Sequence, residues 1–219
     1  MNVDYIIFDN DGTLYQMGTG FKERVVGSMI KFLSRRIGIP ERQVIEERKR
    51  LIEKYGVEST EFVFGVEYGI NHSEFVRKTY LLVPIKDYGA INDRKLQQML
   101  QNIKPPKSIL TNNPSEFARK IIRTLGVEQF FKHVIGSKEI SYRLKPDKKA
   151  FLTTADITGC DLKRTVFIDD VPEFLYPAKE LGMTTVLLSK DDKFLSNGYI
   201  DYQIKEIYDL ENLVRGGIK

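Results

Sequence analysis

Five short apolar runs, each followed by a turn and then by a helical pattern, constrain the fold more than any other feature of the sequence. They occupy residues 5–9, 108–112, 133–137, 165–170 and 184–189. Between them, residues 115–126 and 147–159 carry apolar side chains three and four positions apart, and each segment closes on a glycine that suits a helix C-cap. Strands that alternate with helices are typical of a parallel, doubly wound sheet. Continuous apolar strands agree with this, because parallel strands are buried on both faces.

One interval breaks the alternation. Residues 18–83 show only helical periodicity, with an apolar face formed by Phe21, Val25, Met29, Ile30, Leu33 and Ile37. A helical stretch of this length is too long for an ordinary connection between neighbouring strands. We therefore expect an α/β core with a doubly wound, mainly parallel sheet from residues 1–16 and 86–219, and a helical subdomain, residues 17–85, inserted after the first strand.

Composition and charge limit the classes of function. The chain has 219 residues, of which 42% are hydrophobic and 29% charged, as in ordinary globular proteins. Its formal net charge is +4, but basic and acidic residues are interleaved, which suits an anionic small molecule better than a nucleic acid. We expect a small-molecule substrate, no nucleic-acid partner, and a monomer by default.

Cysteine content and the length of the apolar runs bear on the compartment. The single cysteine, Cys160, excludes an internal disulfide framework. No apolar run approaches the ~18 residues of a membrane span, and the first residues lead directly into a strand without a leader pattern. We therefore expect a cytoplasmic protein with no membrane association.

Polar residues gather where three of the predicted strands end, which is where open α/β sheets bind their ligands. They are Asp9 and Asp11 after the first strand, Thr111 after the second, Asp169 and Asp170 after the fourth, and Lys145 in a loop before a helix. Four converging carboxylates repel one another, so a cation is needed to hold them together. Oxygen ligands favour Mg²⁺ over Zn²⁺, and the chain has only two histidines, His72 and His133. We expect Mg²⁺ as the cofactor.

The same residues suggest a reaction. With Mg²⁺ present, one carboxylate can attack phosphorus and form an aspartyl-phosphate that water then hydrolyses. The second acid, two residues on, can protonate the leaving oxygen and later accept a proton from the attacking water. Thr111 and Lys145 would supply a hydroxyl and an ammonium to the charged phosphoryl oxygens. These residues predict hydrolysis of a small phosphate monoester, such as a nucleoside 5′-monophosphate or a sugar phosphate.

Four ordered segments resemble the motifs of the haloacid dehalogenase superfamily of Asp-dependent phosphohydrolases. They are "DNDGT", "ILTN", "LKPD" with a downstream "AF", and "VFIDD", and together they extend over nearly the whole chain. The resemblance implies that Asp9 is the nucleophile and a Mg²⁺ ligand. It makes Asp11 the general acid and base, which also binds the metal through its main-chain oxygen. The resemblance also implies that the helical insert is the cap domain of this superfamily, whose closure would exclude water and select the substrate.

The resemblance assigns the remaining site residues as well. Thr111, with Asn112 beside it, and Lys145 would hold the transferring phosphoryl group. Asp170 would bind Mg²⁺ directly, and Asp169 directly or through water. The chain is most similar to the pyrimidine 5′-nucleotidase type in the stretches "FDNDGTLY", "YGVESTEFVFGVEYGINHSEFVRKTYLLVPI" and "FIDDVPEFLYPAKELGMTTVLL".

Two positions depart from the superfamily pattern. Asn10 stands between the paired acids, where an apolar residue is more usual, and we expect its side chain to point away from them. Phe174 stands where the superfamily often has Asp or Asn, so one polar residue that would surround the metal is missing. Asp169 or Glu173 would take its place. Tyr15, just past the first motif, is a candidate for substrate contact.

The sequence leaves other functions open. A phosphomutase would use the same fold and move phosphate between two positions of a sugar phosphate. A non-catalytic module would bind a phosphoryl ligand without turnover. Asp11 and the acidic fourth motif argue against a carbon–halogen hydrolase, which needs no metal.

Overall fold

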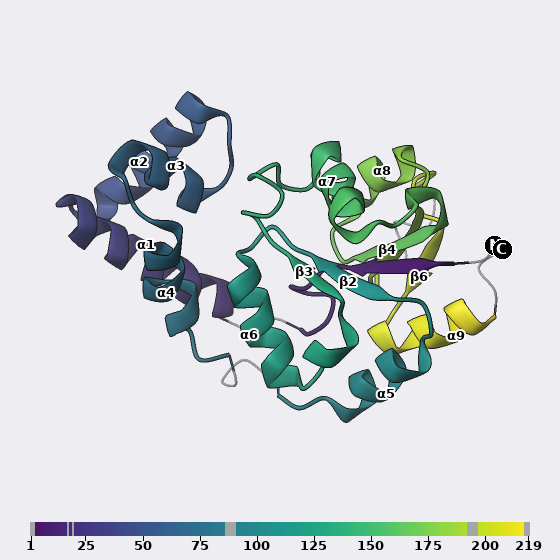
Figure 1. Cartoon of the computed structure of the whole chain (residues 1–219). Coiled ribbons are helices and arrows are strands. Elements are labelled where there is room, and N and C mark those ends of the chain that lie inside the picture. Colours follow the sequence, from purple (N-terminus) through teal and green to yellow (C-terminus); the bar gives the residue numbers. More distant parts are fainter. Residues whose placement is uncertain (1–2, 17, 19, 86–90, 192–196, 217–219) are drawn as a thin grey trace. The chain divides into compact units, whose positions relative to one another are not determined.

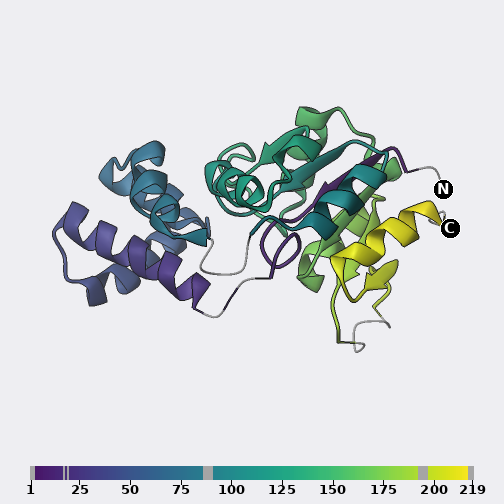
Figure 2. The same cartoon turned by 90° about the horizontal axis from the view of Figure 1, so that it is seen from below.

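The computed structural model describes residues 3–16, 18, 20–85, 91–191 and 197–216. The chain divides into two compact units. One, the core unit, consists of Met1–Gln16 and Ala90–Lys219, and the other, the helical unit, of Met17–Gly89. Both are drawn in Figures 1 and 2, and each is described by itself.

The core unit contains a six-stranded parallel sheet with the strand order β3-β2-β1-β4-β5-β6. The strands are β1 (Tyr5–Phe8), β2 (Lys107–Leu110), β3 (His133–Ile135), β4 (Thr165–Asp169), β5 (Thr184–Leu188) and β6 (Tyr202–Ile204). The strand order reverses beside β1, because the chain runs outward through β2 and β3 and then returns to the other side of β1 as β4. The predicted fold class, an α/β doubly wound parallel sheet, is confirmed. Strand β6 was not predicted; it is a three-residue edge strand in which only Ile204 is buried.

Strand register brings the predicted polar residues to one edge of the sheet. Phe8, the last residue of β1, pairs with Ile109 on one side and Ile168 on the other. The next residue, Asp9, continues this pairing, since its backbone N–H donates to Ile168 O at 2.8 Å. Thr111 directly follows Leu110, the last residue of β2. The chain segments that follow β1, β2 and β4 therefore begin side by side.

Helices cover both faces of this sheet. Figures 1 and 2 show α7 and α8 on one face and α5, α6 and α9 on the other. These helices are α5 (Arg94–Asn102), α6 (Ser115–Leu125), α7 (Lys148–Thr158), α8 (Pro172–Glu180) and α9 (Leu210–Arg215), with short 3₁₀ turns at Glu128–Phe130, Leu162–Arg164 and Ile207–Asp209. The predicted helices over 115–126 and 147–159 are confirmed as α6 and α7, and each ends at a glycine with a left-handed φ.

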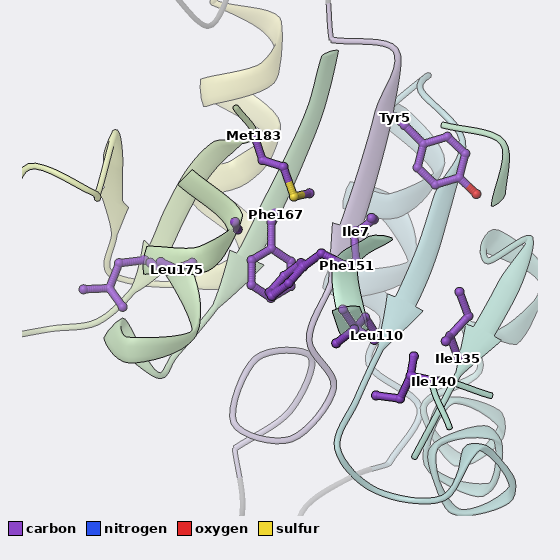
Figure 3. Packing of buried hydrophobic residues seen from close by; sticks show 12 residues of the cluster. Tyr5, Ile7, Leu110, Ile135, Ile140, Phe151, Phe167, Leu175 and Met183 are labelled. Carbon is purple, nitrogen blue, oxygen red and sulfur yellow. The ribbon is translucent and has the colours of Figure 1, made fainter. Parts of the chain in front are cut away.

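A hydrophobic cluster on the α7 and α8 face holds the central strands in place (Figure 3). Phe151 of α7 packs edge to face on Phe167 of β4, with ring centroids 5.0 Å apart. Ile7 of β1 and Leu175 of α8 belong to the same cluster, and all four side chains are fully buried. Because protein interiors are densely packed, this cluster limits how far the strand ends can shift.

The helical unit has a core of its own. Its elements are α1 (Phe21–Ile37), α2 (Glu41–Tyr55), α3 (Thr60–Tyr68), α4 (His72–Lys78) and a 3₁₀ turn at Tyr80–Leu82. The core consists of Leu33, Val44, Leu51, Val63, Phe64, Ile70 and Phe75, with Met29, Ile30 and Ile37 of the predicted α1 face packed against it. The described part of this unit contains no strand, as the helical periodicity predicts. Across the described chain, no helix is both long and apolar enough to cross a membrane.

Candidate active site

The turn after β1 is built around a glycine that no other residue could replace without a shift. Gly12 has a φ of 93°, in the region that side-chain-bearing residues avoid. A Cβ on Gly12 would lie 2.3 Å from Asp170 Oδ2, so the absent side chain allows this turn to approach the end of β4. Leu14 N donates to Asn10 O at 3.1 Å and closes the turn. The "DNDG" segment is thereby bent back at the sheet edge, with Asp170 against it.

Lys145 joins two of the predicted site carboxylates. Its Nζ donates to Asp9 Oδ1 at 2.7 Å and to Asp169 Oδ2 at 2.6 Å. The Lys145 and Asp169 side chains are fully buried, and that of Asp9 is 9% exposed. The other oxygen of Asp169 accepts from Val171 N at 2.9 Å. The lysine and its two acids therefore form a buried, hydrogen-bonded group.

Asp9, Asp169 and Asp170 form a carboxylate group in which one oxygen from each residue lies within 4.8 Å of the others. When all are ionised, these three carboxylates and the Lys145 ammonium leave two negative charges, the amount that one divalent cation balances. All the candidate donors are oxygens, which suits a hard cation. The residues present therefore fit a divalent-cation site.

The pKa values of the residues in this group also fit a divalent-cation site. Burial, opposed by the Lys145 ammonium and reinforced by the Asp169 carboxylate, raises the pKa of Asp9 to about 7. Burial, followed by repulsion from Asp9, raises the pKa of Asp170 to about 6. Burial also lowers the pKa of Lys145, but Asp169 and Asp9 outweigh this and raise it above its ordinary value. The lysine therefore stays charged, while the acids need either protons or a cation.

The Asp11 carboxylate has different surroundings, although it is only two residues from Asp9. Tyr15 Oη donates to Asp11 Oδ1 at 2.7 Å, and Asn113 Nδ2 donates to Asp11 Oδ2 at 2.9 Å. Thr111 Oγ1 also donates to Oδ2, at 3.3 Å. Neighbouring carboxylates in unlike surroundings can perform unlike tasks in one reaction, as a nucleophile and a proton carrier must.

The three residues after β2 contact different parts of this site. Thr111 donates to Asp11, and its hydroxyl accepts from Asn113 N at 3.1 Å. Asn112 pairs with the main chain of Lys145, through Nδ2 to Lys145 O at 2.9 Å and from Lys145 N to Oδ1 at 2.8 Å. The structure therefore brings Thr111 to the Asp11 carboxylate and Asn112 to the main chain of Lys145.

Two of these contacts, those of Asn113 and Tyr15 with Asp11, are not predicted by the sequence patterns. Asn113 was not singled out, although it is a second amide directly after the strand. Tyr15, the candidate for substrate contact, is 6% exposed, and its hydroxyl donates to Asp11. Burial, and then the Asp11 carboxylate, raise the pKa of Tyr15 above its ordinary value, so its hydroxyl remains a hydrogen-bond donor.

The two departures from the motif pattern have distinct surroundings. Asn10 is fully buried, and neither polar atom of its side chain has a hydrogen-bond partner among the described residues. Phe174 places its ring centroid 5.0 Å from Lys145 Nζ, within the range of a cation–π contact. Of the two proposed substitutes around the metal, Asp169 belongs to the carboxylate group that the described residues form, and Glu173 does not.

A family model described as haloacid dehalogenase-like hydrolase matches residues 3–182 of the chain. The chain belongs to this family of hydrolases. The match runs from β1 to the end of α8 and contains all the site residues described above.

Three curated relatives are phosphatases by name. Validoxylamine A 7'-phosphate phosphatase of Streptomyces hygroscopicus subsp. limoneus is 23% identical over 116 residues, 53% of this chain and 54% of the relative. Glyceraldehyde 3-phosphate phosphatase of Methanocaldococcus jannaschii is 36% identical over 99 residues, 44% of this chain and 42% of the relative. Phosphoglycolate phosphatase of Pseudomonas syringae pv. syringae is 24% identical over 96 residues, which are 44% of this chain and 35% of the relative. The chain thus spans about half, or less, of the length of these relatives.

Solved structures share the fold over almost the full chain. A HAD phosphatase from Thermococcus onnurineus has a TM-score of 0.65 at 21% identity and covers 99% of both chains. The HAD-hydrolase YfnB from Bacillus subtilis, solved with magnesium, has a TM-score of 0.60 at 17% identity, covering 98% of this chain and 99% of that one. L-2-haloacid dehalogenase from Xanthobacter autotrophicus has a TM-score of 0.59 at 14% identity and covers 98% of this chain and 99% of that one. At such identities these likenesses establish the fold alone.

Proposed function

We propose that this protein is a Mg²⁺-dependent phosphatase that hydrolyses a small phosphate monoester through an aspartyl-phosphate on Asp9. The observation that carries the proposal is the division of the site into two parts. Asp9 lies in a group with the buried Lys145 and Asp169 and the half-buried Asp170, whereas Asp11 lies among neutral donors. Membership of the hydrolase family and the names of the relatives support the same reaction class.

In the first step, an oxygen of Asp9 attacks phosphorus as the bond from phosphorus to the ester oxygen breaks. Protonated Asp11 gives its proton to that leaving oxygen, so the alcohol departs neutral. In the second step, Asp11 accepts a proton from water as the water attacks the aspartyl-phosphate. Inorganic phosphate leaves, and both acids return to their starting forms. Lys145 and Thr111 donate to the phosphoryl oxygens as negative charge builds on them.

Asp9, Asp169 and Asp170, with the main-chain oxygen of Asp11, would hold the Mg²⁺ ion. When bound, Mg²⁺ supplies positive charge that brings the phosphoryl oxygens and the Asp9 carboxylate together. Support comes from the carboxylate group itself, whose two excess negative charges a divalent cation balances.

Residues 17–85, which lie within the helical unit, would act as the cap that selects the substrate. The position of this unit in the chain directly after the first motif and its independent core support this assignment. The relatives are named for three different phosphate esters, and the pyrimidine 5′-nucleotidase-type branch rests on the sequence stretches quoted above. We therefore propose the substrate class as small phosphate monoesters, including nucleoside 5′-monophosphates.

Phosphate release from p-nitrophenyl phosphate tests the proposal. Activity should require Mg²⁺, disappear with EDTA and return when Mg²⁺ is restored. Asp9→Asn should abolish it, whereas Asp156→Asn, an exposed aspartate on α7, should retain it. Equal rates with and without EDTA, or full activity of Asp9→Asn, would overturn the proposal. A panel of about a hundred metabolite phosphates then identifies the substrate, and transfer within a sugar phosphate without phosphate release would identify a mutase instead.

A further inference from the structure

The side-chain amide of Asn112 pairs with the main chain of Lys145 in both directions. Lys145 N donates to Asn112 Oδ1 at 2.8 Å, and Asn112 Nδ2 donates to Lys145 O at 2.9 Å. An amide carries a donor and an acceptor in one plane, whereas a carboxylate at this position would lack the donor. These bonds connect the turn after β2 to a residue 33 positions further along the chain.

The segment that carries Lys145 depends on such anchors, because residues 136–147 contain neither helix nor strand. Near its beginning, Glu139 accepts from Gly136 N at 2.9 Å and from Ser115 Oγ at 2.8 Å. Glu139 thus fixes the beginning of this loop to the first residue of α6, and Asn112 fixes its end.

The position of the Lys145 backbone matters because its ammonium must reach two carboxylates at once. Nζ lies 2.7 Å from Asp9 Oδ1 and 2.6 Å from Asp169 Oδ2. These acids constrain the ammonium, whereas Asn112 holds the backbone from which the side chain extends. In an active site, a misplacement of about 1 Å can lower the rate by about a hundredfold.

We propose that Asn112 is a positioning residue that acts through Lys145 by holding its main chain. This inference rests on the proposed phosphatase function, since Lys145 is the group through which Asn112 affects the reaction. It assigns Asn112 a task other than the phosphoryl contact that the family resemblance implies.

Lysine labelling tests the inference without any enzymatic assay. Reductive methylation followed by peptide mass spectrometry reports how often Lys145 Nζ, fully buried in the structure, becomes accessible. In Asn112→Ala we expect labelling of Lys145 to accelerate about tenfold, because its backbone N–H and C=O lose their partners. Lys107 is the internal reference, since its Nζ is bound to Ile103 O at 2.6 Å and reports general opening of the fold. The neighbouring variant Asn113→Ala should leave Lys145 labelling unchanged.

A double-mutant cycle supplies the kinetic test. Asn112→Ala should lower kcat/KM about tenfold in the wild-type background and less than about twofold in the Lys145→Ala background, because residues that act through one another are not additive. If the losses of kcat/KM in the two single variants multiply in the double variant, Asn112 contacts the substrate independently of Lys145. That result would overturn the proposal. So would wild-type labelling of Lys145 in Asn112→Ala, or an equal rise at Lys107. If the wild-type protein releases no phosphate from any ester, the proposed function fails, and the labelling experiment alone decides the positioning role.

Discussion

Lys145 and Asp9 form a buried ion pair, with 2.7 Å between Nζ and Oδ1, although 136 residues separate them in the chain. The same ammonium contacts Asp169, which belongs to a different strand. The nucleophile candidate is therefore held in position by a cation from one loop and by the register of the central strands. The second acid of the motif, Asp11, does not belong to this ion pair. Its carboxylate accepts hydrogen bonds from the Tyr15 hydroxyl and the Asn113 amide.

Replacing Lys145 by methionine should lower kcat/KM on p-nitrophenyl phosphate by at least about a hundredfold, because a charged donor to the phosphoryl group is lost. Methionine keeps the apolar part of the side chain next to Phe167 and Phe174. Lys149→Met, an exposed lysine on α7, is the matched control and should keep wild-type rates. A loss of less than about threefold in Lys145→Met would show that the lysine takes no part in the reaction.

Thermal stability of the metal-free protein should fall as the pH rises from about 4 to about 7. The pKa of Asp9 is raised to about 7 and that of Asp170 to about 6, mainly by burial. A raised pKa in the folded state means that protonation favours folding, so this contribution is present at low pH and is lost as the carboxylates ionise. Saturating Mg²⁺ should remove most of the loss, because the cation replaces the protons.

Unfolding midpoints in EDTA and in Mg²⁺ across this pH range provide the measurement. The doubly substituted variant, with Asp9→Asn and Asp170→Asn, removes the two groups and should flatten the pH dependence in EDTA. A wild-type midpoint that falls no more than that of this variant between pH 4 and 7 would contradict the prediction.

Tyr15→Phe should lower kcat about tenfold while leaving KM nearly unchanged. The substitution keeps the buried ring and removes only the hydroxyl, which donates to Asp11 Oδ1 at 2.7 Å. Without this bond the acid loses one of the donors that orient it for proton transfer, an effect within the usual range for general acid–base catalysis. Tyr176→Phe, 52% exposed on α8, is the control. If Tyr15 contacts the substrate instead, KM should rise while kcat holds.

Gly12→Ala should destabilise the protein and nearly abolish activity. The new Cβ would lie 2.3 Å from Asp170 Oδ2, so either the turn or the carboxylate must shift. Gly159→Ala separates this clash from backbone strain, since Gly159 also has a left-handed φ, 69°, but no atom within 4 Å of the added Cβ. The control should cost about 1 kcal/mol in the free energy of unfolding and leave kcat unchanged. Equal losses in the two variants would show that the approach of Asp170 to Gly12 is unimportant.

Much of the fold is predictable because its signals are local. Continuous apolar runs predicted five of the six strands in the described part of the chain, and the periodicity between residues 18 and 83 predicted helices there. The short edge strand β6 carries no such signal, because it buries only one side chain. Helix α5, which precedes β2, was not anticipated either, although it buries Leu96, Met99 and Leu100.

The sequence by itself determined which chemical groups stand at the strand ends. It predicted that Asp9, Lys145, Asp169 and Asp170 would meet, because parallel strands end at one edge of a sheet. Only the tertiary structure decided how they pair: the ammonium bridges Asp9 and Asp169, and the amide of Asn112 holds the lysine backbone. Contacts of this kind depend on loop paths and on directions of side chains, which have no periodic pattern. Spacing along the chain therefore predicts the members of the site, while packing in three dimensions selects their partners.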